Sequence, residues 1–170
     1  MLNSYLSILE DSLKKKLAVL EQIDEVSDVQ TALLKEETFD LERFDATVDE
    51  KDAFIKQLSE LDDGFETLYE KVREELLKDR RQYEQQIGRM QKLIGQITDK
   101  SVSIQAKESR NKAAVERYFA REKKSIGQDR KTAKAAYGYY KNMNNTNVPA
   151  SRFMDQKKYC LLYTSDAADD

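Results

Sequence analysis

Hydrophobic residues recur every three or four positions over most of the first 143 residues, a spacing that predicts long amphipathic helices. A narrow apolar stripe on a long helix can be buried only against another helix. In the first stretch the recurring apolar positions are Leu2, Leu6, Leu9, Leu13, Leu17, Leu20, Ile23, Val26, Val29 and Leu33. We therefore predict an all-α protein, built as a long antiparallel helical bundle or a coiled-coil hairpin with a flexible C-terminal tail.

Breaks in the stripe and local helix signals divide this region into three expected helices. Thr38 or Asp40 is suited to cap the second helix, since either side chain can accept a hydrogen bond from an exposed backbone N–H. Residues 98–103 are weak helix formers and predict a turn or kink. The expected helices span residues 2–35, 41–98 and 104–142.

Two features of the second stretch need an interpretation. The segment Asp62-Asp63-Gly64 could end a helix, but one glycine costs only about 1 kcal/mol, so we expect the helix to continue. The stripe pauses after Leu76 and resumes at Tyr83, which we interpret as a stutter that unwinds a coiled coil without ending the helix. Gly88 and Gly95 either let a neighbouring helix approach closely or are merely tolerated.

The C-terminal part of the chain differs in composition from the rest. Asparagines from Asn142 onward, followed by Pro149, predict the end of the third helix. We expect a helical domain over residues 1–143 and a flexible tail over 144–159. Residues 160–170 resemble a translated sequencing adapter and are expected to be a non-native artefact, so Cys160 carries no information about redox compartment.

Charge is distributed unevenly along the chain. The full sequence has 29 Lys and Arg against 32 Asp and Glu, and three of those acidic residues belong to the final segment. Residues 1–99 hold 14 basic against 24 acidic residues, a net charge of −10, whereas residues 100–134 hold 11 against 4, a net of +7. The asymmetry predicts an interaction surface, or two parts that attract each other.

Few residues are suited to catalysis. The chain has no histidine, the commonest general base and zinc ligand, and its five glycines form no phosphate-binding loop. Adjacent carboxylates such as Glu74-Glu75 point in different directions on a helix. We therefore predict no enzyme activity, no catalytic residues, no cofactor and no metal site. No apolar run is long enough to span a membrane and no signal peptide is visible, so we expect a cytoplasmic protein without membrane insertion.

The third stretch carries the best candidate binding surface. Its apolar stripe is thin, which predicts weak packing on the other helices, and it is rich in tyrosine, which is enriched at binding surfaces. Phe119 and Tyr137 could equally pack on the first two helices, but neighbouring tyrosines cannot all face a core. The candidate partner-binding residues are Val115, Tyr118, Phe119, Ile126, Ala133, Tyr137, Tyr139, Tyr140 and Met143.

The basic character of residues 100–134 has two readings. Basic helices can follow the phosphates of nucleic acids. However, acidic residues interrupt this stretch, which favours a solvated helix lying against an acidic face, with residues 36–75 as the candidate. We therefore expect no nucleic-acid partner.

Several segments resemble the FlgN-type flagellar export chaperones over about residues 1–158. The similar segments are Lys35–Leu41, Glu50–Leu58, Tyr139–Met143 and Ser151–Lys158. The resemblance implies a chaperone that binds C-terminal helical segments of flagellar hook–filament junction proteins through its own C-terminal helix. It also implies delivery of this cargo to the type III export machinery.

The predicted function is thus a non-enzymatic export chaperone that binds an amphipathic helix of its cargo. The third helix would exchange its weak contacts within the chain for contacts with the cargo. A structural coiled-coil protein that only self-associates is the alternative, and a nucleic-acid-binding helical protein is a more remote one.

Overall fold

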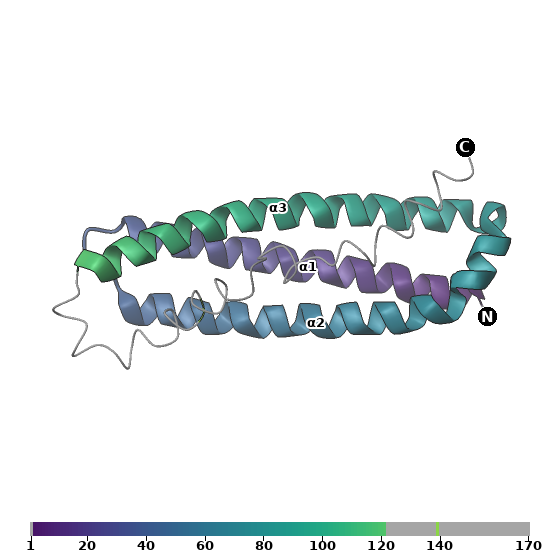
Figure 1. Cartoon of the computed structure of the whole chain (residues 1–170), viewed down its shortest axis with the longest axis horizontal. Coiled ribbons are helices and arrows are strands. Elements are labelled where there is room, and N and C mark those ends of the chain that lie inside the picture. The colour runs from purple at the N-terminus through teal and green to yellow at the C-terminus, as the bar shows by residue number, and fades with distance from the viewer. Residues whose placement is uncertain (1, 122–138, 140–170) are drawn as a thin grey trace.

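The computed structural model describes residues 2–121 and 139, and the described residues are almost entirely helical. Helix α1 (Leu2–Lys35) is followed by antiparallel α2 (Leu41–Lys78), and α3 (Glu84–Arg121) returns parallel to α1 (Figure 1). A short 3₁₀ helix, η1 (Arg80–Tyr83), joins α2 to α3. The prediction of an all-α bundle of long helices is confirmed for this part of the chain.

The first two helix starts and the first helix end agree with the sequence prediction. Asp40 is the N-cap of α2, and its Oδ1 accepts a hydrogen bond of 3.1 Å from the backbone N–H of Arg43. Helix α2 passes through Asp62-Asp63-Gly64 without a break, as expected. At about 1.5 Å per residue, α1 is roughly 50 Å long, and the bundle is therefore elongated.

The predicted helix over residues 41–98 is wrong, because the chain reverses between Leu76 and Tyr83. The backbone N–H of Asp79 donates to the carbonyl of Glu75 over 3.1 Å, and α2 ends there. Leu76 and Tyr83 are one heptad apart, so the stripe does not slip and no stutter is needed. The apolar residue expected midway between them is absent, because residues 78–82 are all polar. These residues have no apolar side chain to bury, and they form the turn.

The predicted turn or kink at residues 98–103 is also wrong, since α3 continues through it. Ser101 is buried against the other helices, and the Thr98 hydroxyl donates to the carbonyl of Ile94 over 2.8 Å. Tertiary packing thus outweighs the weak helix propensity of the segment. The predicted helix over 104–142 is not separate: residues 104–121 form the C-terminal part of α3, and 122–142, apart from Tyr139, lie outside the described residues.

Most buried positions along each helix are spaced three or four residues apart, the pattern of a coiled coil. This repeat corrects the predicted stripe of α1. Val29 is 45% exposed, whereas Lys16, Ser27 and Gln30 lie on the repeat and are buried. Polar residues at these core positions persist because they have partners; Lys16 Nζ, for example, lies 2.7 Å from Asp62 Oδ1.

Helix α1 is the centre of the bundle and packs along both α2 and α3, whereas the backbones of α2 and α3 hardly approach each other. Two apolar clusters form the core. The main apolar cluster extends from Leu2, Tyr83 and Ile87 at one end of the bundle to Ile23, Leu58 and Ile104. The distal apolar cluster, near the α1–α2 turn, contains Leu33, Phe44, Val48, Val115 and Tyr139.

Two helical glycines offer a test of the packing. A Cβ atom added at Gly64 or Gly88 would meet nothing within 4 Å, so Gly88 marks no close approach of a neighbouring helix. We predict that Gly64→Ala and Gly88→Ala each raise the free energy of unfolding by about 0.5–1 kcal/mol, because alanine loses less backbone entropy in a helix. Urea denaturation measures the change, and Ala53→Gly at an exposed α2 position should cost a similar amount. A loss of stability in both alanine variants would contradict the open geometry.

Within residues 2–121, no helix is both long enough and apolar enough to cross a membrane.

Candidate functional site

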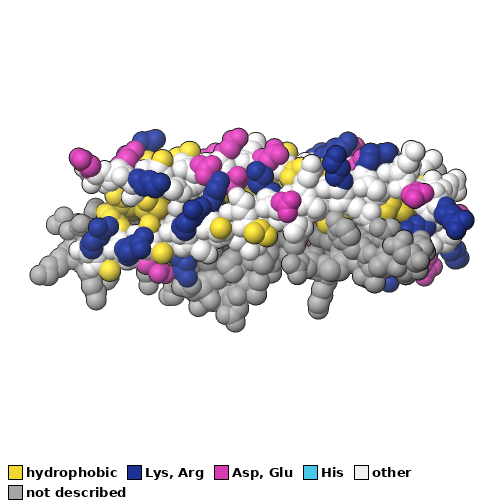
Figure 2. Space-filling model, turned by 90° about the horizontal axis from the view of Figure 1, so that it is seen from above, with side chains coloured by type: hydrophobic (Ala, Val, Ile, Leu, Met, Phe, Trp, Pro, Cys, Tyr) yellow, Lys and Arg dark blue, Asp and Glu magenta, His cyan; other side chains and the backbone are white. Residues whose placement is uncertain are grey.

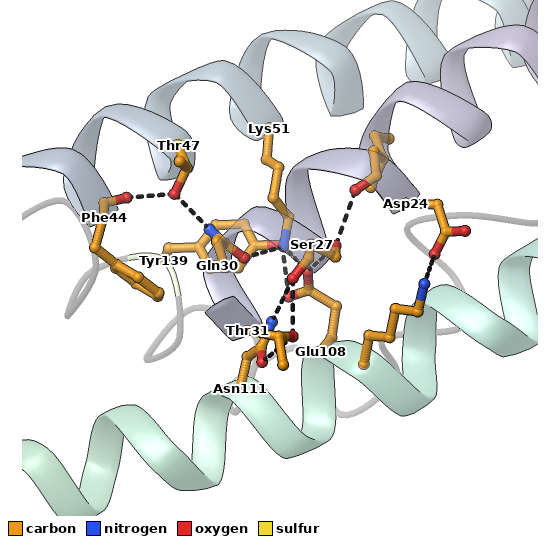
Figure 3. A network of polar contacts seen from close by, with 12 residues as sticks. Asp24, Ser27, Gln30, Thr31, Phe44, Thr47, Lys51, Glu108, Asn111 and Tyr139 are labelled. Carbon is orange, nitrogen blue, oxygen red and sulfur yellow. Dashed lines mark hydrogen bonds and ion pairs between the residues drawn. The ribbon is translucent and has the colours of Figure 1, made fainter. Parts of the chain in front are cut away.

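A cluster of polar side chains lies inside the bundle at the junction of all three helices (Figure 3). Gln30 comes from α1, Lys51 from α2 and Glu108 from α3, and each of these side chains is almost completely shielded from solvent. Ser27 of α1 and Tyr139 complete the group, which we call the polar cluster. It lies beside the distal apolar cluster, which shares Tyr139 with it.

The centre of the polar cluster is an ion pair between Lys51 and Glu108, whose side chains are both 0% exposed. Lys51 Nζ also donates to Gln30 Oε1 over 2.9 Å, and Gln30 Nε2 donates to Thr47 Oγ1 over 3.0 Å. Removing two charges from water is costly, and only close pairing with further hydrogen bonds offsets that cost. The network supplies both, and it connects α2 to α3 where their backbones stay apart.

Tyr139 closes this network from a position far along the chain. Its hydroxyl donates to Glu108 Oε2 over 3.0 Å, and its ring centre lies 5.2 Å from Lys51 Nζ. The residue is only 4% exposed and also packs with Phe44, Val48 and Val115. Tyr139 therefore lies between α2 and α3, in what we call the α2–α3 seam: Phe44, Val48 and Lys51 of α2 facing Glu108 and Val115 of α3.

A second set of polar contacts fixes α1 against α3 next to the ion pair. Asn111 Nδ2 donates to the backbone carbonyl of Ser27 over 3.1 Å, and the Thr31 hydroxyl donates to Asn111 Oδ1 over 2.9 Å. The Ser27 hydroxyl lies 2.9 Å from the carbonyl of Ile23 and 3.4 Å from Glu108 Oε1. Because these bonds are satisfied only in one alignment of the helices, they specify the register between α1 and α3.

An acidic face that receives two basic residues of α3 lies on α1. Asp24 lies 2.7 Å from Lys107 Nζ and 3.3 Å from Lys100 Nζ, and Asp28 lies 2.8 Å from Lys107 Nζ. The prediction that residues 36–75 supply this face is wrong for these two lysines, because α3 packs along α1 rather than α2. Both lysines have carboxylate partners within the chain.

These contacts change the acidity of Asp24. Burial raises the pKa of this carboxyl group, but hydrogen bonds and charges from Lys107 and Lys100 outweigh burial and hold the pKa below its usual 3.8. A carboxyl group whose pKa is depressed by folding stabilises the protein above its unfolded pKa, and that contribution is lost as the pH falls through the folded pKa.

We therefore predict an acid-sensitive contribution from Asp24. The stability of the wild-type protein should fall as the pH is lowered from about 4, and Asp24→Asn should show a smaller fall over the same range. Urea denaturation at a series of pH values measures both slopes, with Asp63→Asn, at an exposed position of α2, as the matched substitution away from these ion pairs. Equal slopes for Asp24→Asn and the wild type would contradict the assigned ion pairs.

An aromatic group and an open pocket lie at the end of the bundle where α3 ends. The Tyr118 ring lies 4.5 Å from that of Phe39 and 5.6 Å from that of Phe119, measured between centres. Figure 2 shows hydrophobic side chains gathered at this end, with Lys and Arg side chains beside them. The pocket has a volume of about 570 Å³ and is lined by Leu34, Glu36, Glu37, Thr38, Phe39, Ala114, Arg117, Tyr118 and Arg121.

The structure places four of the predicted partner-binding residues. Val115 and Tyr139 are both buried in the distal apolar cluster, Phe119 packs against its edge, and Tyr118 lines the end pocket. Phe119 therefore follows the core-packing interpretation, and so does Tyr139, which had been the stronger candidate for exposure. The predicted residues Ile126, Ala133, Tyr137, Tyr140 and Met143 lie outside the described residues.

The polar cluster itself was missed by sequence reasoning. Lys51, Glu108 and Gln30 look like solvated charges and amides on a long helix, which is what most such residues are. The signal that could have found them is the spacing of three and four, since each of them occupies a core position of its helix. An isolated lysine and an isolated glutamate at core positions of two helices suggest a buried pair.

The fold and the site together define an all-α helical bundle with a buried polar cluster. No known family model, curated protein or solved structure matches this chain.

Proposed function

We propose that this protein is a non-enzymatic export chaperone that binds an amphipathic helical segment of flagellar hook–filament junction proteins. Delivery of the cargo to the type III export apparatus is part of the same proposal. Two lines support it. The first is the resemblance of several segments to FlgN-type chaperones, and the second is the arrangement of α2 and α3 around Tyr139.

The observation that carries the proposal is the burial of Tyr139 in the α2–α3 seam. The backbones of α2 and α3 hardly approach each other, and within residues 2–121 the helices that pack on them are α1 and, at one end, the short η1. Tyr139 supplies a side chain to the seam from a distant part of the chain. An amphipathic helix of a partner is suited to this seam, since four helices would then surround one core.

The part of the chain that gives up its contacts when cargo binds differs from the one expected from the sequence. Residues 104–121 are part of a long, well-packed helix, with Ile104, Glu108 and Val115 buried. They are therefore unsuited to leave the bundle when cargo arrives. In the revised mechanism the α2–α3 seam stays in place, and the cargo helix takes the position of Tyr139.

Competition between Tyr139 and cargo gives the proposal a direct test. A segment of the same chain that occupies the seam reduces the apparent affinity for cargo in proportion to its occupancy. In full-length protein, Tyr139→Ala should therefore bind purified hook–filament junction proteins several-fold more tightly than wild type. Isothermal titration calorimetry measures the affinity, and gel filtration should show a one-to-one complex.

Tyr5→Ala is the matched control, because Tyr5 packs on the main apolar cluster, away from the seam. It should leave the affinity for cargo unchanged. If neither the wild type nor Tyr139→Ala forms a complex with hook–filament junction proteins, the proposal is overturned. A concentration-dependent dimer without cargo would support the self-associating coiled coil instead.

A further inference from the structure

The α2–α3 seam presents chemistry that fits one amino acid side chain in particular. At its base, Phe44, Val48 and Val115 offer apolar contact, and beside them Glu108 offers a carboxylate oxygen. The Lys51 ammonium group faces the ring of the residue that occupies the seam, at 5.2 Å. A suitable side chain must therefore bring an aromatic ring and a hydroxyl donor at its far end.

Tyrosine meets both requirements, whereas phenylalanine, serine and asparagine each lack one of them. Phenylalanine has the same ring but would deprive Glu108 of the donor that now lies 3.0 Å from Oε2. Serine and asparagine have donors but lack the ring that covers Lys51. Because the ion pair is fully buried, water cannot easily replace the lost hydrogen bond, and a site that binds a hydroxyl this way discriminates strongly against an occupant without one.

We propose that the buried Lys51–Glu108 pair makes the α2–α3 seam selective for tyrosine, so that the partner helix it accepts carries a tyrosine. This inference rests on the proposed function, because it names the chemistry of the same partner. The two charges of the pair neutralise each other, so the occupant is expected to be uncharged at this position. Lys51 and Glu108 are then specificity-determining residues of the seam.

A displayed peptide library tests the selectivity directly. The probe is a set of 17-residue peptides with the sequence of residues 131–147, in which position 139 is varied to all twenty amino acids. The bait is the full-length protein with Tyr139→Ala, which vacates the position. Tyrosine should be enriched about tenfold or more over phenylalanine, because a hydrogen bond to a buried charged group is at stake.

The matched bait adds Lys51→Met and Glu108→Met, which replace the pair by apolar side chains of similar size. Its preference for tyrosine should vanish or turn toward phenylalanine. Equal enrichment of tyrosine and phenylalanine on the first bait would overturn the inference. So would a preference for tyrosine that persists without the pair.

An intramolecular measurement decides the matter if the peptides bind too weakly to be enriched. In the full-length protein, Tyr139→Phe should increase the unfolding equilibrium constant about tenfold, and the same change should have little effect in the Lys51→Met/Glu108→Met background. Equal effects in the two backgrounds would overturn the inference.

Neither the peptide library nor the stability measurement uses cargo, so the seam can prove selective for tyrosine even if hook–filament junction proteins fail to bind. If the protein forms dimers in which each copy places its Tyr139 in the seam of the other, the selectivity for tyrosine would stand. The inference that a partner helix occupies the seam would be overturned.

Discussion

Replacing Glu108 by methionine is expected to lower the free energy of unfolding by about 3–5 kcal/mol, the largest single effect on this protein. The substitution keeps the length of the side chain but leaves the Lys51 ammonium group, which is 0% exposed, without its carboxylate partner. Tyr139 loses its acceptor at the same time. Urea denaturation followed by circular dichroism measures the change.

The double variant Lys51→Met/Glu108→Met is the decisive control. Replacing both members of a buried pair by apolar residues is often neutral or stabilising, so most of the loss should be recovered. Glu10→Gln, at the pair that Glu10 forms with the largely exposed Arg89, should cost far less than Glu108→Met. If the double variant is as unstable as Glu108→Met, the damage does not come from an unpaired charge.

Truncating Phe44 to alanine is the second large effect, with an expected loss of about 3–5 kcal/mol. Phe44 is completely buried and is the largest aliphatic or aromatic side chain of the distal apolar cluster that α2 contributes. Because the polar cluster lies between this end and much of the main apolar cluster, we expect the loss to be greatest near the α1–α2 turn. Hydrogen exchange should accelerate most at the ends of α1 and α3 next to that turn.

Met90→Ala provides the comparison from the main apolar cluster. Met90 is also completely buried, and its truncation should cost about 2–5 kcal/mol. Its effect on hydrogen exchange should spread over the middle and opposite end of the bundle rather than the α1–α2 turn. Identical exchange patterns for the two variants would show that the bundle opens as one unit and that the polar cluster does not divide it.

The polar cluster is an unusual use of core positions. An apolar core would fold without the cost of burying charges, so Lys51 and Glu108 do not merely fill space. Their hydrogen bonds fix the alignment of α2 and α3, which lack extensive backbone contact with each other. On the proposed function, the same pair sets which side chain the α2–α3 seam accepts.

Helix boundaries show where local signals suffice. The start and end of α1, the start of α2 and the Asp40 cap follow from residues within a few positions of each boundary. The turn between α2 and α3 was missed because one absent apolar position can mean either a stutter or a reversal. Contacts that α3 makes with α1 after the reversal decide between them.

The sequence by itself determined that the protein is all-α and that long amphipathic helices pack on one another, because the three-and-four spacing of apolar residues is a local property of each helix. It did not determine that Lys51, Glu108 and Tyr139 are buried in contact with one another. Lys51 and Glu108 are 57 positions apart, and whether they meet depends on the register of α2 and α3 against α1. Only the tertiary structure decides that register, and with it which polar side chains are solvated and which form the buried polar cluster.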